Sequence, residues 1–298
     1  MNKPSAPISP TTQFVILGIL SLVWGSSFFL IKKALVAFEP EQVASLRISL
    51  SALSFLPIVL YHFRKIDWQS WRWLLVVGLT GSAVPAFLFS TAQTELSSTI
   101  AGILNSLAPF FTLVFGLLIF KVAAKRSQIG GVLLGLFGAI LMTMAGEQGS
   151  AFGNLLYGLL IVGAAACYGF SANVVASRLQ HMKSIHLSSA SFVLVGPLGL
   201  IYLFSTDFLE VLQTHPHGKA SFAAVIFLAL VGTVAASVLF YWLIQKTSAL
   251  FGSTVAYLMP VVSLGWGLWD GEAINHWHFI GMGLILLGVW LSKGKRRK

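Results

Sequence analysis

Hydrophobic residues along this chain occur in long continuous blocks, not in the alternation of a half-buried strand. A block of about 20 apolar residues crosses a bilayer as a helix, because a helix satisfies its own backbone polar groups. Ten blocks can be marked: Phe14–Ile31, Val43–Leu60, Trp73–Ala92, Thr99–Phe120, Ile129–Ala145, Phe152–Val175, Leu187–Phe204, Phe222–Ile244, Ala249–Trp269 and Ile274–Leu291. The pattern therefore predicts an all-α membrane protein with ten transmembrane helices.

Part of this pattern occurs twice. The segment from Gly81 to Gly130 aligns without a gap on Gly232 to Gly281, an offset of 151 residues. Apolar and small residues coincide while charges change sign: Phe89 on Phe240, Leu107 on Leu258, Pro109 on Pro260, Gly116 on Gly267, but Glu95 on Lys246 and Lys121 on Glu272. Two copies with opposite orientations in a membrane would differ in this way. We therefore expect two inverted five-helix repeats, 14–146 and 152–292, an architecture found chiefly in transporters.

Composition and charge agree with a membrane location. The chain is 56% hydrophobic and 9% charged, against roughly 25% charged residues in a soluble domain. With the N-terminus inside, 15 of the 19 basic residues fall on the inner side, which predicts cytoplasmic N- and C-termini in the cell (inner) membrane. The net charge of +10 then comes from basic residues of the inner loops, which lie beside the anionic lipid leaflet. We therefore expect the lipid bilayer, and no nucleic acid, as the partner of these charges.

Several short motifs support a family resemblance. They are Trp24-Gly25-Ser26-Ser27, echoed 144 residues later by Tyr168-Gly169-Phe170-Ser171, together with Leu46-Arg47, the Pro109 and Pro260 helices, and Gly271-Glu272. With the paired five-span halves, they resemble the EamA-type members of the drug/metabolite transporter superfamily. Two features depart from that pattern: Phe120-Lys121 stands where the first half would carry Gly-Glu, and Ile48 follows Arg47 where an aromatic residue is common. The resemblance implies small-molecule transport, often export, through a cavity lined by spans 1, 3, 4, 6, 8 and 9.

The clearest candidate site is a small and polar stripe in span four. Its members recur every three or four residues, which places them on one helix face: Gly102, Asn105, Pro109, Thr112 and Gly116. Their counterparts at +151 are again mostly small or polar: Ser253, Ala256, Pro260, Ser263 and Gly267. Such a stripe is either a close-packing seam between helices or a cavity wall whose prolines free backbone carbonyls for substrate. Asn105 is the best single candidate, because a buried amide without a partner is costly.

Arg47 is the one formally charged residue inside a predicted span. It could hold a substrate carboxylate. Alternatively, it lies about one turn from the outer end of its helix and could extend outward as a charge anchor. We favour the role of Arg47 as a charge anchor, partly because the family resemblance does not place span two in the cavity wall.

Aromatic residues near the stripe could stack on a substrate or simply pack. Tyr257 is the strongest of them, because it precedes Pro260 and its hydroxyl needs a partner. The complete set of candidate substrate-binding residues is Trp24, Ser27, Phe87, Asn105, Pro109, Thr112, Tyr168, Trp242, Tyr257, Pro260 and Ser263.

Other chemistries have weaker support. The pairs His215/His217 and His276/His278 lack any Cys or carboxylate spacing for zinc, and no phosphate loop or His-Glu-x-x-His motif occurs. We therefore expect no metal, no cofactor and no enzymatic activity. Gly131 and Gly135 in span five, with Gly281 and Gly288 in span ten, fit close helix contacts, either within the bundle or across a homodimer.

The sequence thus predicts a secondary transporter that exports small metabolites such as amino acids by alternating access. The cargo and the direction come from the resemblance. No Asp or Glu lies inside a predicted span, so proton coupling would need a boundary group such as Glu95, Asp270 or Glu272, and a facilitator fits equally well. A membrane-embedded enzyme, or a lipid-handling or sensor protein without flux of soluble solutes, is the alternative.

Overall fold

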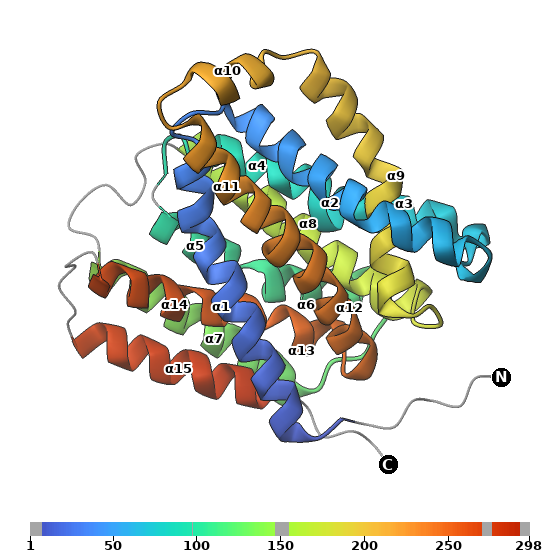
Figure 1. Ribbon diagram of the computed structural model, residues 1–298. Helices are drawn as coiled ribbons and strands as arrows, with labels where there is room; N and C mark the ends of the chain where they lie inside the picture. The colour runs from blue at the N-terminus through green and yellow to red at the C-terminus, as the bar shows by residue number, and fades with distance from the viewer. Residues whose placement is uncertain (1–7, 97, 147–154, 270–275, 293–298) are drawn as a thin grey trace.

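In the computed structural model of the protein, residues 8–96, 98–146, 155–269 and 276–292 are described, and every regular element among them is helical (Figure 1). The first half of the chain contains α1 (Pro10–Ala34), α2 (Pro40–His62), η1 (Phe63–Lys65), η2 (Trp68–Ser70), α3 (Trp71–Gly78), η3 (Leu79–Ala83), α4 (Val84–Ala92), α5 (Ser98–Asn105), α6 (Ala108–Leu118) and α7 (Arg126–Gly146). The second half contains α8 (Leu155–Arg178), α9 (Ser184–Phe204), α10 (Phe208–Thr214), α11 (Gly218–Ala229), η4 (Leu230–Ala235), α12 (Ala236–Lys246), α13 (Ala249–Ser253), α14 (Val255–Trp269) and α15 (His276–Ser292).

Many of these helices have membrane dimensions. Seven helical segments are long and apolar enough to cross a bilayer: Pro10–Ala34, Pro40–Lys65, Trp68–Ala92, Ile100–Leu118, Leu155–Arg178, Ser184–Phe204 and Gly218–Lys246. Two shorter apolar helices, Ala249–Val262 and Phe279–Ser292, follow them. Large apolar side chains such as Leu60, Phe204 and Trp290 are exposed on the outer surface of the bundle, as expected where helices face lipid. The prediction of an all-α membrane protein is confirmed at this level.

Local sequence explains where several helices begin. The Ser9 hydroxyl accepts a hydrogen bond from the Thr12 backbone N–H at 3.1 Å, and Pro10 supplies a fixed φ in the first turn of α1. The Ser248 hydroxyl accepts from the Phe251 N–H at 3.1 Å in the same way and starts α13. Each cap satisfies one of the backbone donors that a helix start leaves free.

Glycines permit the closest helix contacts. The helices α7 and α15 lie side by side (Figure 1), and a Cβ atom added at Gly131 would lie 2.7 Å from the Gly288 carbonyl oxygen. A Cβ atom at Gly288 would in turn lie 2.6 Å from the Gly135 backbone nitrogen. These glycines therefore make a contact within one chain, the first of the two alternatives left open by the sequence.

Four of the predicted spans are irregular. In spans three and eight, the π-helical segments η3 and η4 interrupt the α-helix, and their first residues, Leu79 and Leu230, are 151 residues apart. In span four α5 ends at Asn105 and α6 begins at Ala108, with Ser106 and Leu107 in a turn between them. A similar break separates α13 from α14 in span nine. Irregular backbone at membrane depth is tolerated where protein buries it or where it lines a cavity.

Candidate substrate cavity

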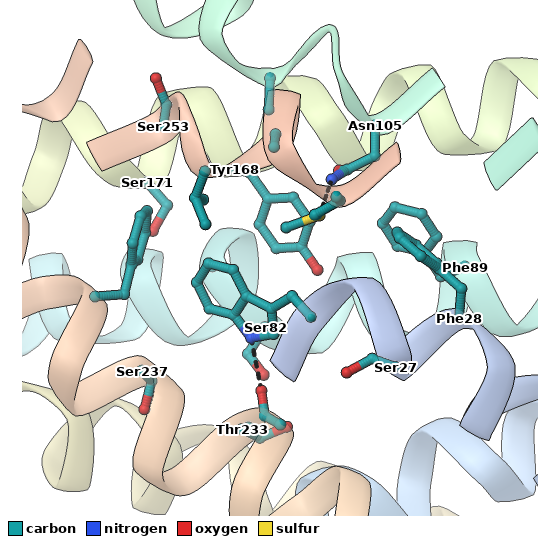
Figure 2. Close-up of a pocket in the computed structure, with 18 of the residues that line it drawn as sticks. Ser27, Phe28, Ser82, Phe89, Asn105, Tyr168, Ser171, Thr233, Ser237 and Ser253 are labelled. Carbon is teal, nitrogen blue, oxygen red and sulfur yellow. Dashed lines mark hydrogen bonds between the residues drawn. The ribbon is translucent and has the colours of Figure 1, made fainter. Parts of the chain in front are cut away.

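A cavity of about 100 Å³ lies where these irregular segments meet (Figure 2). Elements from both halves of the chain line it, including α1, η3 and α5 from the first half and α8, η4 and α14 from the second. The lining residues are Trp24, Ser27, Phe28, Ile31, Arg47, Gly81, Ser82, Phe89, Asn105, Ala108, Tyr168, Ser171, Phe192, Gly232, Thr233, Ser237, Phe240, Tyr241, Ser253, Val255, Ala256 and Met259. The wall is thus aromatic, with hydroxyl groups distributed over it.

The two π segments supply glycines at which the neighbouring helix approaches closely. A Cβ atom at Gly81 would lie 2.6 Å from the Ser171 hydroxyl oxygen, and one at Gly232 would lie 3.1 Å from the Ser27 hydroxyl oxygen. Ser27 and Ser171 are 144 residues apart, so the two contacts are equivalent in the duplicated sequence. π-Helical bulges occur frequently at functional sites, and here both lie in the cavity wall.

Trp24 connects α1 to the second π segment. Its indole Nε1–H donates to the Gly232 carbonyl oxygen at 2.8 Å. Its ring packs edge-on against Phe240, with 5.0 Å between centroids. The indole is therefore oriented by both a hydrogen bond and packing, which fixes one aromatic wall of the cavity.

Asn105 places an unsatisfied acceptor at the cavity. The residue is the last of α5, is 3% exposed, and its Nδ2 donates to the Met259 sulfur at 3.2 Å (Figure 2). A thioether accepts but never donates, which assigns the amide nitrogen to the Met259 side. The Oδ1 atom is buried and has no hydrogen-bond partner. A buried acceptor without a partner costs about 1–3 kcal/mol, so this oxygen is a strong candidate for contact with a ligand.

Arg47 also lines the cavity. Its Nε–H donates to the Thr233 hydroxyl oxygen at 2.7 Å, and that hydroxyl donates to the Leu228 carbonyl oxygen at 2.9 Å. The guanidinium is therefore tied to η4 across the bundle. This placement differs from the outward-directed anchor favoured by the sequence, and it adds span two to the cavity wall.

A second cavity of about 260 Å³ lies between the ends of α6, α8 and α12. Thr112, Gly116, Asn173 and Thr247 are among its lining residues. The Asn173 Nδ2 atom donates to the Thr112 and Gly169 carbonyl oxygens, each at 2.9 Å. This amide thus holds α8 against α6 beside the second cavity.

Comparison with known proteins identifies the family. The model of the EamA-like transporter family matches the chain twice, at residues 13–144 and 155–293. The chain belongs to the EamA-like transporter family. It is accordingly a multi-pass membrane transporter, whose environment is the lipid bilayer and whose substrate class is small molecules.

Relatives of this EamA-family chain extend over nearly its whole length. An "Uncharacterized transporter" of Archaeoglobus fulgidus is 25% identical over 95% of this chain and 99% of its own. The "Uncharacterized inner membrane transporter YedA" of Escherichia coli K12 is 27% identical over 91% of this chain and 87% of its own. A "Probable amino-acid metabolite efflux pump" of the same strain is 25% identical over 92% and 94%. A solved crystal structure superposes with a TM-score of 0.71 at 18% identity, over 95% and 96% of the two chains, which supports the fold alone.

The structure brings together several of the residues singled out in the sequence of this EamA-family transporter. Trp24, Ser27, Arg47, Asn105 and Tyr168 all line the first cavity, and so do Ser253 and Ala256 of the second stripe. Figure 2 shows Tyr168 near the centre of the view, with its hydroxyl group directed into the space.

The other candidates lie elsewhere. Thr112 lines the second cavity. Pro109 and Pro260 are buried in the helices α6 and α14, outside the first cavity's lining, and Trp242 packs on the central apolar core. Phe87 packs edge-on against Tyr202, at 6.4 Å between centroids. The side chain of Ser263 lies outside the described residues.

The hydroxyl group of Tyr257 forms a hydrogen bond within the protein. Its ring is fully buried, and its hydroxyl donates to the Val132 carbonyl oxygen at 2.7 Å. A Cβ atom at Gly135 would lie 2.7 Å from the ring. Tyr257 therefore joins α14 to α7, and its hydroxyl is not available to a solute in this structure.

Sequence reasoning did not single out several cavity hydroxyls. Ser82 and Thr233 follow the paired glycines Gly81 and Gly232, so the duplicated frame carried a signal for them. Ser171 belongs to the motif that echoes Trp24–Ser27 and was likewise visible as a repeat. Ser237 had no comparable signal, because the residue 151 positions earlier is Ala86.

Proposed function

We propose that this chain is a secondary carrier for small polar or amphipathic metabolites such as amino acids, moved outward by alternating access. The unpaired Asn105 Oδ1 atom, in a cavity lined from both halves, is the observation that carries this proposal. Transporters with internal repeats bind substrate between the repeats, at discontinuous helices. The efflux-pump name of one Escherichia coli relative supports the cargo class and the direction.

The proposed architecture has ten spans in two inverted repeats, 14–146 and 152–292, with both termini cytoplasmic in the inner membrane. The double family match and the 151-residue relation between η3 and η4 support the repeats. The bias of basic residues supports the orientation. In such an arrangement, the contact between α1 and α14 would open on one side of the cavity, and the contact between α8 and α6 would open in turn on the other side.

Flux in proteoliposomes tests the proposal. Purified protein is reconstituted and assayed with labelled amino acids and other small metabolites, with protein-free liposomes as background. We expect saturable flux of at least one solute, and a strong decrease in Asn105→Leu. Ser54→Ala is the matched control, because the Ser54 hydroxyl bonds to the Leu50 carbonyl of its own helix and does not line the cavity. Absence of flux for every soluble compound would contradict the carrier proposal and favour a lipid-handling or sensor role.

A further inference from the structure

Arg47 carries a formal charge that no neighbouring group neutralises. Among the described residues, no carboxylate lies within ion-pair distance of its guanidinium. A guanidinium has five N–H donors, and one of them, Nε–H, bonds to the neutral Thr233 hydroxyl. The Thr233 hydrogen is already used on the Leu228 carbonyl. The two terminal nitrogens have no partner among the described residues, although charged groups buried in membrane proteins are ordinarily paired.

The rest of the cavity wall offers no compensating anion. Arg47 is the one charged residue among the described residues that line it, and the other polar members are hydroxyls and the Asn105 amide. A single positive charge surrounded by low-dielectric aromatic walls produces a positive potential in the cavity. Such a cavity attracts an anionic group and disfavours a solute that is only cationic.

We propose that Arg47 binds the carboxylate of the transported solute through its two terminal nitrogens. This inference rests on the proposed carrier function and names the substrate class of the same site. The bond from Nε to Thr233 fixes the plane of the guanidinium and leaves free the terminal N–H pair, which matches a carboxylate bidentately. Arg47 thus selects solutes that carry a carboxylate group, and Thr233 is the residue that positions the guanidinium.

The remaining wall defines the rest of the solute. Trp24, Phe28, Phe89 and Tyr168 present aromatic surface for an apolar body. One cation neutralises one carboxylate, so a monocarboxylate fits where a solute with two or three negative charges would keep an uncompensated charge. An amino acid satisfies this description, and the unpaired Asn105 Oδ1 is an acceptor for its ammonium in the wall of the same cavity.

Matched pairs of solutes test the inference on the unaltered protein. The probes are L-leucine, L-phenylalanine and 3-phenylpropionate, each compared with its primary amide as a competitor of flux and as a stabiliser of the detergent-purified protein against heat. The acids should act at concentrations about 30-fold below their amides, because removing one partner of a buried charge pair weakens binding by at least that factor. Amides as effective as acids in both measurements would overturn the assignment.

The thermal measurement separates failure of this inference from failure of the carrier proposal. If no solute is transported while the acids alone stabilise the protein, Arg47 binds carboxylates in a protein that is not a carrier. If amines or neutral solutes are transported and no carboxylate competes, the carrier proposal stands and the Arg47 assignment fails.

Variants place the discrimination at Arg47. Arg47→Gln should lose the preference for acid over amide by weakening the acid alone, and Arg47→Lys should keep part of it, because a point charge lacks the fork geometry. Arg72→Gln is the control, since Arg72 is exposed, lies outside the cavity and contacts the Trp71 ring. A full acid preference in Arg47→Gln would refute the assignment. If that variant does not fold, the acid and amide pairs on the unaltered protein decide the question.

Discussion

Two helix crossings occupy equivalent places in the duplicated sequence and are held together by different chemistry. One joins α1 to α14 at Gly25, and the other joins α8 to α6 at Gly169, 144 residues later. At Gly25 an added Cβ atom would meet the Val262 side chain first, at 2.7 Å. At Gly169 it would meet the backbone of α6 first, at 2.7 Å from the Thr112 nitrogen.

The polar contacts of the two crossings differ in burial. At the α1–α14 crossing, Trp266 is 42% exposed, stacks on Phe29 and donates from Nε1 to the Ser26 hydroxyl at 3.0 Å. At the α8–α6 crossing, Asn173 is 4% exposed and donates to the Thr112 carbonyl oxygen of α6 and to the Gly169 carbonyl oxygen of its own helix. A buried hydrogen bond is costly to lose, and the bond from Asn173 to the Thr112 carbonyl is more deeply buried than the bond from Trp266 to Ser26. The α1–α14 crossing should therefore separate with less free energy than the α8–α6 crossing.

The largest effect is expected from Gly169→Ala. Its methyl group would press on backbone that has no rotamer to change, and overpacking of this kind costs about 1–3 kcal/mol. We expect a value at the upper end of that range, seen as a lower Tm in detergent and as lost flux. Gly163→Ala is the control in the same helix, because its methyl group would have only the Leu88 Cδ1 atom nearby, at 3.7 Å. Equal effects of the two substitutions would contradict the close contact at Gly169.

Replacement of the buried amide should have the next largest effect. Asn173→Leu keeps the branched shape of the side chain and removes the donor to the Thr112 and Gly169 carbonyls, which should destabilise the protein by about 1–2 kcal/mol. Trp266→Phe removes the equivalent exposed donor while keeping an aromatic ring against Phe29, and surface changes of this kind stay within about 0.5 kcal/mol. Thermal unfolding of both variants compares the crossings directly. A larger loss in Trp266→Phe would reverse the proposed order.

Gly25→Ala should be milder than Gly169→Ala. The closest atoms to the new methyl group are the Val262 Cβ at 2.7 Å and Cγ1 at 2.9 Å, and the nearest backbone atom is the Met259 carbonyl oxygen at 3.3 Å. A small shift of α14 can relieve this contact, at a cost of about 1 kcal/mol. Val262→Ala added to Gly25→Ala should recover part of the Tm, because it removes the Cγ1 atom 2.9 Å from the added Cβ. No recovery in the double variant would indicate that the Val262 Cβ, which lies 2.7 Å from the added methyl group and is retained in alanine, limits this crossing.

The sequence predicted which helices correspond in the two halves, but not which side chains are in contact where they cross. The apolar blocks specify helices because their length leaves few other ways to bury so many apolar residues. The offsets of 144 and 151 residues relate Gly25 to Gly169 and Phe111 to Val262. Neither offset states which side chains touch, because that depends on how helices from different halves pack.

The packing of helices from different halves also determined which contacts of the site residues could be predicted from the sequence. Asn105 could be singled out from sequence because a polar amide in an apolar block needs a partner wherever the helix lies. Arg47 could not be assigned a direction, because Thr233, which holds it, is 186 residues away. Tyr257 was expected to need a partner for its hydroxyl, but the choice of the Val132 carbonyl follows from α7 packing beside α14.

The smallest effect should come from two polar links between the first and second halves of the chain. His181 Nε2 lies 2.9 Å from Asp67 Oδ2, and Gln42 Nε2 donates to Asp207 Oδ1 at 2.9 Å. The Ser70 hydroxyl, then His181, bond to the Asp67 carboxylate and hold its pKa below its ordinary value. Because the folded pKa lies below the unfolded one, this stabilisation is present above the unfolded pKa and disappears as pH falls through the folded pKa.

Asp67→Asn should therefore lower Tm near neutral pH by about 1 °C, since exposed ion pairs contribute little. The difference from the unaltered protein should vanish below the ordinary titration range of aspartate and shrink in high salt. Asp207→Asn should leave Tm near neutral pH unchanged, because its amide oxygen still accepts from Gln42. Unfolding scans of both variants from neutral to acidic pH measure this contrast, and a deficit in Asp67→Asn that grew on acidification would show that the Asp67–His181 pair does not provide it.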